Sequence, residues 1–431
     1  MPRIAASGSR ETGPAANDEQ SVAGTGHDGS RPLRSVPFRW FFTGRTISLA
    51  GSSMSQVALA FGVLARTGSA GWVAAVTSTA MVATIATMLL GGGIADRYRR
   101  STVLALTSLG AGIAQAGIAV LLITGRPPAL LLPFALASGT FQGLTTPVLR
   151  GIIANLASGR GLQQASSLLA SASNLTRIAG PAIAGLLTAS VGGGWAVAAD
   201  AASFLLAAAC FARITMPGPP KRDGDGPSML GDLREGWQYF ASQPWFWSVT
   251  LAFAIFNATN RGVWQVLGPV IAFHTIGAPG WGLVLSTQGI GALFASVVLV
   301  KVPLPRRPLR PALTAMALAA LPLVLLGGGA GLLWLAGVSL LAGAASEFFT
   351  VTWQTVNYTN ISERLLSRVG AHDEFWSFVS YPLGQISAPL LAAAFGTAAV
   401  ALSGGTAAAA AMLCVSLLPL FRRIEIRPGE P

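Results

Sequence analysis

The feature that constrains this chain most is a series of apolar blocks that recur along nearly its whole length. A helix needs about 20 apolar residues to cross the hydrocarbon core of a bilayer, which is about 30 Å thick. From Phe38 onward, blocks of this length follow one another with short polar or Gly/Pro-rich interruptions. This pattern predicts an all-α membrane protein.

Composition supports that prediction and excludes several other classes of protein. Only 10% of the 431 residues are charged and 52% are hydrophobic, whereas soluble domains carry roughly 25% charged residues. Cys210 and Cys414 lie inside apolar blocks, and His27, His274 and His372 are widely separated, so neither a disulfide framework nor a metal site is indicated. No P-loop motif for ATP hydrolysis is present. We therefore predict no enzyme, no metal and no cofactor.

The basic residues predict the orientation in the membrane. The formal charge is +12, but it is spread in small groups rather than gathered in one patch, which argues against a nucleic-acid partner. Cytoplasmic loops hold an excess of Lys and Arg. Nearly all the loop arginines and lysines fall on one predicted side, and the opposite loops contain only Arg66 and Arg126. Both termini are therefore predicted to be cytoplasmic.

We predict twelve spans in two bundles of six. The predicted spans are 37–65, 70–95, 101–124, 128–154, 164–191, 193–213, 244–274, 278–301, 308–328, 331–358, 373–396 and 399–421. They define a bundle over 37–213 and a second over 244–421, joined by a cytoplasmic linker, 214–243, with an amphipathic stretch at 230–240. Residues 1–36 are predicted to be a disordered cytoplasmic tail, and 422–431 a second cytoplasmic tail.

Two sequence echoes indicate that the bundles are an internal repeat. Arg99-Arg100 returns as Arg306-Arg307, at an offset of 207, and Gly180-Pro181 returns as Ala388-Pro389, at an offset of 208. Transporter folds are often built from such repeats. The matching offsets favour duplication of a six-helix unit.

The loop after the second span resembles the signature of the major facilitator superfamily. It contains Gly92, Asp96, Arg97 and Arg100, but it lacks one of the family's glycines and is one residue shorter. The resemblance implies a conformational latch at the cytoplasmic face that meets the start of the eleventh span near Asp373. A plain positively charged loop is the alternative.

The fifth predicted span resembles the antiporter motif of proton-coupled exporters in that superfamily. Its residues are Arg177, Gly180, Pro181 and Gly185, with Ala184 in place of a glycine. Small residues let two helices pack closely, and proline bends a helix. Generic helix packing is the alternative explanation of the same residues.

Longer stretches are similar to the macrolide-efflux-type drug antiporters, also called transmembrane secretion effectors. The similar stretches are 44–48, 200–204, 233–237, 366–369, 372–373 and 381–384. The resemblance implies export of lipophilic or amphipathic molecules by proton antiport, by a monomer in a bacterial inner or sole membrane, with the proton gradient as energy source. Uptake of a nutrient or metabolite, by active or facilitated transport, and a non-transporting membrane receptor are the alternatives.

Charged residues inside the predicted spans are the strongest functional candidates. Each costs at least about 2.5 kcal/mol at the centre of a membrane helix and tends to face a cavity or a partner. Glu347 and Asp200 are the candidates for proton coupling, with a structural hydrogen-bonded role as the alternative for each. The resemblance places Glu347 and Arg261 on a central cavity, where Arg261 is expected to approach the carboxylate.

Further residues are candidates for lining the substrate cavity. Arg45 is one of them, although it and Arg177 are also suited to pinning helices by hydrogen bonds. The other polar and aromatic candidates are Gln142, Asn257, Asn260, Trp264, Gln265, Trp353, Gln354 and Asn357.

Overall fold

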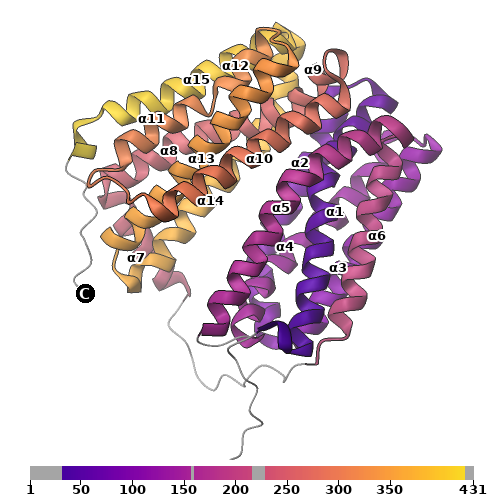
Figure 1. Cartoon of the computed structure of the whole chain (residues 1–431), viewed down its shortest axis with the longest axis horizontal. Helices are drawn as coiled ribbons and strands as arrows, with labels where there is room; N and C mark the ends of the chain where they lie inside the picture. The colour runs from indigo at the N-terminus through magenta and orange to yellow at the C-terminus, as the bar shows by residue number, and fades with distance from the viewer. Residues whose placement is uncertain (1–31, 157–159, 216–228, 423–431) are drawn as a thin grey trace, which may run out of the picture.

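The computed structural model describes residues 32–156, 160–215 and 229–422, and these residues form helices without any strand. Most of the predicted N-terminal tail, nearly all of the C-terminal tail and the first half of the predicted linker lie outside the described residues. The helices form two groups that meet near α9 and diverge toward α7 (Figure 1).

The first group consists of long helices joined by tight turns. Its helices are α1 (Val36–Thr67), α2 (Ala70–Arg97), α3 (Arg100–Thr124), α4 (Leu131–Leu156), α5 (Arg160–Val191) and α6 (Gly193–Ala212), with short 3-10 turns at Pro32–Arg34 and Pro128–Leu130. Gly68 and Gly125 end α1 and α3 with φ angles of 61° and 67°. Glycine adopts this left-handed conformation without steric cost, so both helices can stop abruptly.

The second group contains more helix interruptions. Its elements are α7 (Met229–Ser242), α8 (Pro244–Thr259), the π-helix η3 (Asn260–Leu267), α9 (Gly268–His274), α10 (Gly277–Lys301), α11 (Leu309–Leu318), α12 (Leu321–Gly327), α13 (Leu332–Asn360), α14 (Glu363–Phe395), α15 (Thr397–Leu417) and a 3-10 turn at Pro419–Arg422. The predicted span 244–274 is thus the series α8, η3 and α9. The predicted span 308–328 is interrupted at Ala319 and Ala320, and Pro322 lies in the first turn of α12, where its missing backbone N–H costs no hydrogen bond.

Within the described ranges, nine helical segments are long and apolar enough to cross a membrane. They are α1, α3, α6, α10, α13 and α15, together with Ala70–Met88, Leu309–Gly327 and Phe375–Phe395. The other three predicted spans correspond to α4, to α5 and to the α8–η3–α9 series. The total of twelve and the cytoplasmic position of the termini stay predictions.

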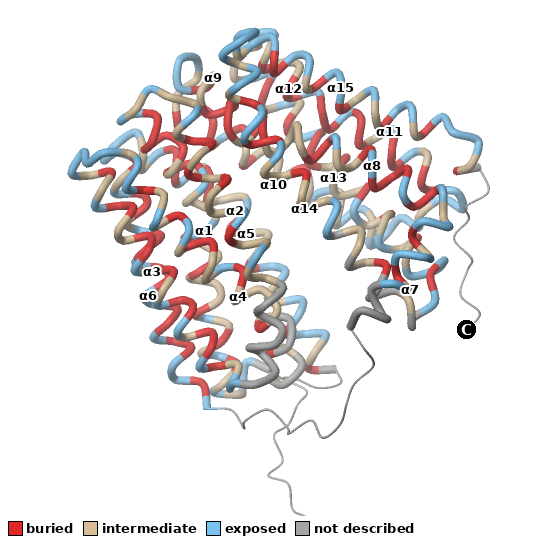
Figure 2. The backbone as a smooth tube through the Cα atoms, turned by 180° about the vertical axis from the view of Figure 1, so that it is seen from behind, coloured by how far each residue is buried: buried red, intermediate tan, exposed pale blue. Residues whose placement is uncertain are grey.

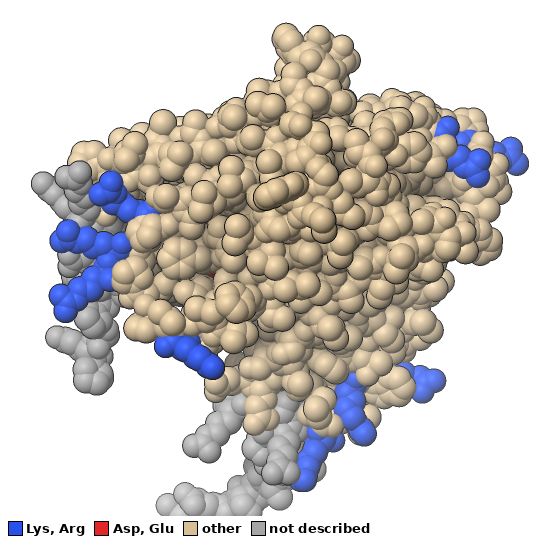
Figure 3. Space-filling view, turned by 45° about the horizontal axis from the view of Figure 1, so that its top comes forward, with Lys and Arg blue, Asp and Glu red and all other residues tan. Residues whose placement is uncertain are grey.

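The distribution of buried and exposed residues suits a protein surrounded by lipid. Buried positions lie between the helices and exposed positions lie on their outer faces (Figure 2). Large apolar side chains are among the most exposed, with Val300 at 85% and Leu333 at 86%. In the view of Figure 3, the Lys and Arg side chains lie at the edges of the molecule, and its broad middle shows none. An apolar belt with basic margins is what a bilayer requires.

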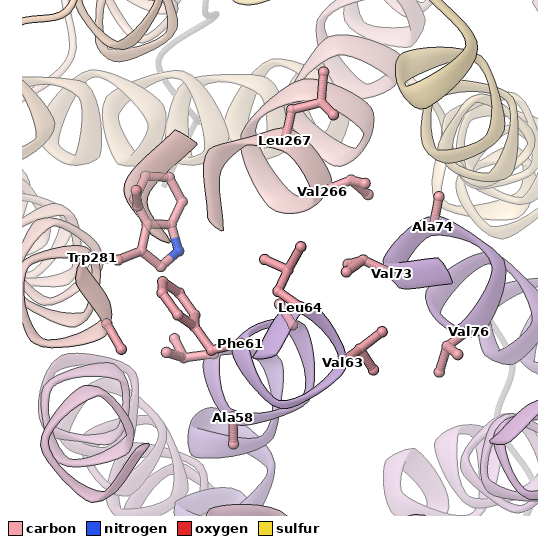
Figure 4. Packing of buried hydrophobic residues seen from close by; sticks show 14 of the residues in the cluster. Ala58, Phe61, Val63, Leu64, Val73, Ala74, Val76, Val266, Leu267 and Trp281 are labelled. Carbon is pink, nitrogen blue, oxygen red and sulfur yellow. The ribbon is translucent and has the colours of Figure 1, made fainter. Parts of the chain in front are cut away.

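One hydrophobic cluster joins the two groups near α9. It contains Phe61 and Leu64 of α1, Val73 of α2, Leu267 of η3 and Trp281 of α10 (Figure 4). The other two clusters are each confined to one group: one includes Phe38 of α1 and the other includes Phe240 of α7. Among the described residues, the hydrophobic cluster that the two groups share therefore lies at the α9 end.

Candidate functional site

A cavity of about 570 Å³ lies between the two helix groups. Ser53 and Gln56 of α1 and Arg177 and Pro181 of α5 line it from the first group. The lining from the second group comes from α8, η3, α9, α10, α11 and α13. The cavity has both aromatic and polar walls, which suits an amphipathic small molecule.

The π-helix concentrates polar and aromatic side chains on one cavity wall. Asn260, Arg261, Trp264 and Gln265 all belong to η3 and all line the cavity. Its wide turns are uncommon and occur often at functional sites. Gly262 allows the close packing behind it, since a Cβ there would lie 2.1 Å from the carbonyl oxygen of Gly384 in α14.

Arg261 is held by two contacts within the second group. Its Nη1 donates a hydrogen bond to Gln265 Oε1 at 3.0 Å. Its guanidinium lies 4.6 Å from the centre of the Tyr381 ring, a cation–π distance. These contacts orient the guanidinium along the cavity wall.

Glu347 lies on α13, is half-buried and lines the same cavity. Among the described residues, none donates a hydrogen bond to its carboxylate or forms an ion pair with it. Arg177 lines the cavity from α5 and is likewise without a protein partner in the described ranges. The cavity thus contains Glu347 and Arg261 as expected, but the two do not pair in this conformation.

Two tryptophans of the second group, Trp264 and Trp281, line the cavity. The rings of Trp264 and Trp281 are 4.6 Å apart, and both belong to the hydrophobic cluster that the two groups share. Phe61 of α1 adds a contact to Phe273 of α9, with ring centres 6.1 Å apart. The two helix groups are therefore in direct contact at the α9 end.

The α5 motif lies where α5 meets two other helices. A Cβ at Gly180 would lie 1.9 Å from Ser53 Oγ of α1, and a Cβ at Gly185 would lie 2.5 Å from the carbonyl oxygen of Ala278 in α10. Across the same interface, a Cβ at Gly282 would lie 2.3 Å from the carbonyl oxygen of Pro181. The motif therefore sets the close approach of the two groups.

Asp200 lies apart from this cavity, in the interior of the first group. It is 0% exposed and lines a second pocket of about 150 Å³. Gln115 Nε2 donates to its Oδ2 at 2.9 Å. The candidate Gln142 also lines this second pocket and not the first.

The structure places four other cavity candidates outside the lining of the central cavity: Arg45, Trp353, Gln354 and Asn357. Trp353 has a different role, because its indole N–H donates to Asp373 Oδ2 at 3.0 Å. Thr250 Oγ1 donates to the other oxygen, Oδ1, at 2.9 Å. Asp373 therefore ties together α8, α13 and α14 near α7.

We expect Asp373→Asn to destabilise this junction. The asparagine amide has one oxygen for the two donors, Thr250 and Trp353, and it turns its NH2 group toward one of them. The free energy of unfolding is therefore expected to fall by about 1–3 kcal/mol. Thermal unfolding of the purified protein checks this prediction. Gln354→Ala is the control, because Gln354 is exposed. An unchanged melting temperature in Asp373→Asn would show that the two hydrogen bonds contribute little.

The predicted latch is only partly described. Gly92, Asp96 and Arg97 lie in the last turns of α2, but their side chains are outside the described part. Arg100 begins α3 and has interaction partners. The latch stays a prediction.

Sequence reasoning missed several polar residues of the lining. Gln56 of α1, Gln288 of α10 and Ser346 of α13 line the cavity without having been predicted. Uncharged glutamines inside apolar blocks are the sequence signal that could have found the first two.

Comparison with known proteins identifies the relatives of this architecture. The chain is 25% identical over 396 residues to the enterobactin exporter EntS of Escherichia coli O127:H6, covering 90% of this chain and 92% of the relative. The enterobactin exporter of Shigella boydii serotype 18 matches with the same identity and coverage.

Solved structures show the same fold at lower sequence identity. The nucleoside transporter NupG superposes with a TM-score of 0.69 at 12% identity, covering 88% of this chain and 98% of that one. A bacterial homologue of the iron transporter ferroportin gives 0.68 at 15% identity, with 90% and 99% covered.

The family assignment rests on a match along most of the sequence. The family model described as Major Facilitator Superfamily matches residues 41–371, a range that runs from α1 to the first turns of α14. The chain is a multi-pass membrane transporter and not an enzyme, and it belongs to the Major Facilitator Superfamily.

Proposed function

We propose that this chain exports lipophilic or amphipathic small molecules, such as a drug, an antibiotic or a secondary metabolite, in exchange for protons. The observation that carries the proposal is the cavity between the two helix groups, in which Glu347 has no described protein partner. Such a carboxylate can take up and release a proton without breaking an ion pair. The membrane would be a bacterial inner or sole membrane.

The cavity wall supports an amphipathic substrate. Phe253, Phe256 and Trp264 provide apolar surface, and Asn260 and Gln265 provide hydrogen-bonding groups within the same lining. A few polar groups among aromatic ones orient a ligand without demanding one structure. Export as the direction is supported by the relatives of 25% identity, which are named exporters of enterobactin.

The packing supports alternating access. The two groups share a hydrophobic cluster at the α9 end, while their other clusters are separate. With the predicted topology, the α7 end is cytoplasmic, so this conformation would receive substrate from the cytoplasm. Substrate would leave from the opposite conformation, and protonation of Glu347 from outside would then favour return to this one.

Inside-out vesicles with an acidic interior and an internal pH dye test the proposal. Compounds from a panel of lipophilic molecules are expected to enter the lumen while protons leave it, so the lumen becomes more alkaline only when both protein and substrate are present. Vesicles without the protein are the control. A substrate that instead accumulates in right-side-out vesicles together with protons would contradict export and identify uptake.

A further inference from the structure

A buried carboxylate in the first helix group lies in a pocket that contains no basic side chain. Asp200 of α6 is 0% exposed, and among the described residues that line its pocket there is neither Lys nor Arg. A buried charge is costly unless another charge compensates it. If Asp200 is ionised, its charge is therefore uncompensated by the described lining.

The polar groups around Asp200 offer oxygen atoms. Ser52 and Ser55 of α1, Gln115 of α3, Ser138 of α4 and Asp200 all line the pocket. Gln115 Nε2 donates to Ser55 Oγ at 3.1 Å and to Asp200 Oδ2 at 2.9 Å. Carboxylate, amide and hydroxyl oxygens are the ligands that hard cations prefer.

One of these oxygens points to a ligand independently of the carboxylate. Gln115 is only 5% exposed, and its Oε1 accepts no hydrogen bond from the protein in the described ranges. The pocket beside it has a volume of about 150 Å³, whereas one water in the liquid takes up about 30 Å³. A lone proton would need none of this space.

The second carboxylate oxygen is also available. Ser203 Oγ donates to the backbone oxygen of Asp200 at 2.7 Å and lies 3.5 Å from Oδ1, at the limit of a hydrogen bond. Gly51 of α1 lets Oδ1 approach that helix, since a Cβ there would lie 2.6 Å from it. The Ser55 and Ser203 hydroxyls lie beside the carboxylate, and Gln115 Oε1 is the pocket oxygen that accepts no hydrogen bond from the described residues.

We propose that the Asp200 pocket binds Na⁺, with Asp200, Gln115 and the serine hydroxyls as ligands. Asp200 lies seven residues from the start of α6, about 10 Å of helix rise, and coupling-ion sites of secondary transporters lie near the bilayer midplane. Asp200 would then be a ligand of a metal ion and not a proton-coupling residue. Na⁺ binding here requires neither the direction nor the proton coupling proposed above.

The position of the pocket connects Na⁺ to transport. Gln56 of α1 lines both this pocket and the central cavity, and it is the residue that the two described linings share. Binding of Na⁺ would add a positive charge to the Asp200 pocket, which Gln56 lines on one side, while Gln56 also lines the central cavity. Substrate affinity is therefore expected to depend on Na⁺.

Equilibrium binding of radioactive Na⁺ to the purified chain, in choline buffer without substrate or gradient, tests the site. Saturable binding is expected in the wild type, with competition by protons as the pH falls. Asp200→Asn and Gln115→Leu are each expected to weaken it by about tenfold or more, because each removes a ligand oxygen or its charge. Gln354→Leu makes the same chemical change outside both pockets and should leave binding unchanged.

Melting curves of the variants without Na⁺ distinguish a lost binding site from a misfolded protein. For the wild type, addition of Na⁺, but not of K⁺, should raise the melting temperature. Absence of saturable binding in the wild type would overturn the proposal. Unchanged Na⁺ binding in both Asp200→Asn and Gln115→Leu would also overturn it. A melting temperature that depends on pH but not on Na⁺ would overturn it as well. Because transport is not measured, failure here is separate from failure of proton-driven export.

Discussion

Glu347→Gln is expected to abolish proton-driven accumulation of substrate while leaving the protein folded. Glutamine has nearly the shape of glutamate but cannot carry a proton, and Glu347 has no described partner that the change would orphan. Exchange of one proton per substrate supports about tenfold accumulation for each unit of pH gradient. A gradient of two units should therefore give about 100-fold accumulation in the wild type and none in the variant.

The measurement is the steady-state substrate ratio across vesicles with imposed pH gradients. Thr350→Val is the matched control, because Thr350 lines the same cavity and, among the described residues, its hydroxyl donates to the carbonyl oxygen of Ser346 in its own helix, at 2.8 Å. Downhill exchange of substrate should persist in Glu347→Gln. Continued accumulation by that variant would place the coupling proton elsewhere.

Gly282→Val is expected to shift the carrier away from the conformation with the α9 end closed. The added Cβ would lie 2.3 Å from the backbone oxygen of Pro181, which a side-chain rotation cannot relieve. Overpacking of this kind costs about 1–3 kcal/mol, so the population ratio of the two conformations should change by about fivefold to about 150-fold. Because α5 and α10 belong to different groups, the strain is relieved when the groups separate.

Labelling of a cysteine at Ala278 reports on this separation. Ala278 is 7% exposed and lies beside Gly185. In a background without Cys210 and Cys414, Ala278→Cys should therefore react slowly with a water-soluble maleimide. The reaction should be faster when Gly282→Val is also present. Gly337→Val is the control, since a Cβ there meets nothing within 4 Å. Equal labelling rates with and without Gly282→Val would show that the α5–α10 contact does not control this end.

Local sequence signals account for most of the helices, and their failures have physical causes. The predicted span 308–328 matches the membrane-spanning segment Leu309–Gly327, yet its continuous apolar run does not reveal that α11 ends at Leu318 and α12 begins at Leu321. Hydropathy could not reveal the π-helix at Asn260–Leu267 either. A wide turn is stabilised by close packing, here against Gly384 of α14, and such packing is invisible in one segment of sequence.

The sequence by itself determined the membrane class and the family, and it singled out the intramembrane charges as candidates, because composition, spacing and short motifs are local properties of the chain. Only the tertiary structure decided which charges share a cavity. Glu347, Arg261 and Arg177 come together there, whereas Asp200 lies in a separate pocket and Trp353 is bonded to Asp373. These placements depend on how helices distant in sequence rotate and pack against one another, and helix rotation follows from interlocking small residues such as Gly185 and Gly282 rather than from hydrophobicity.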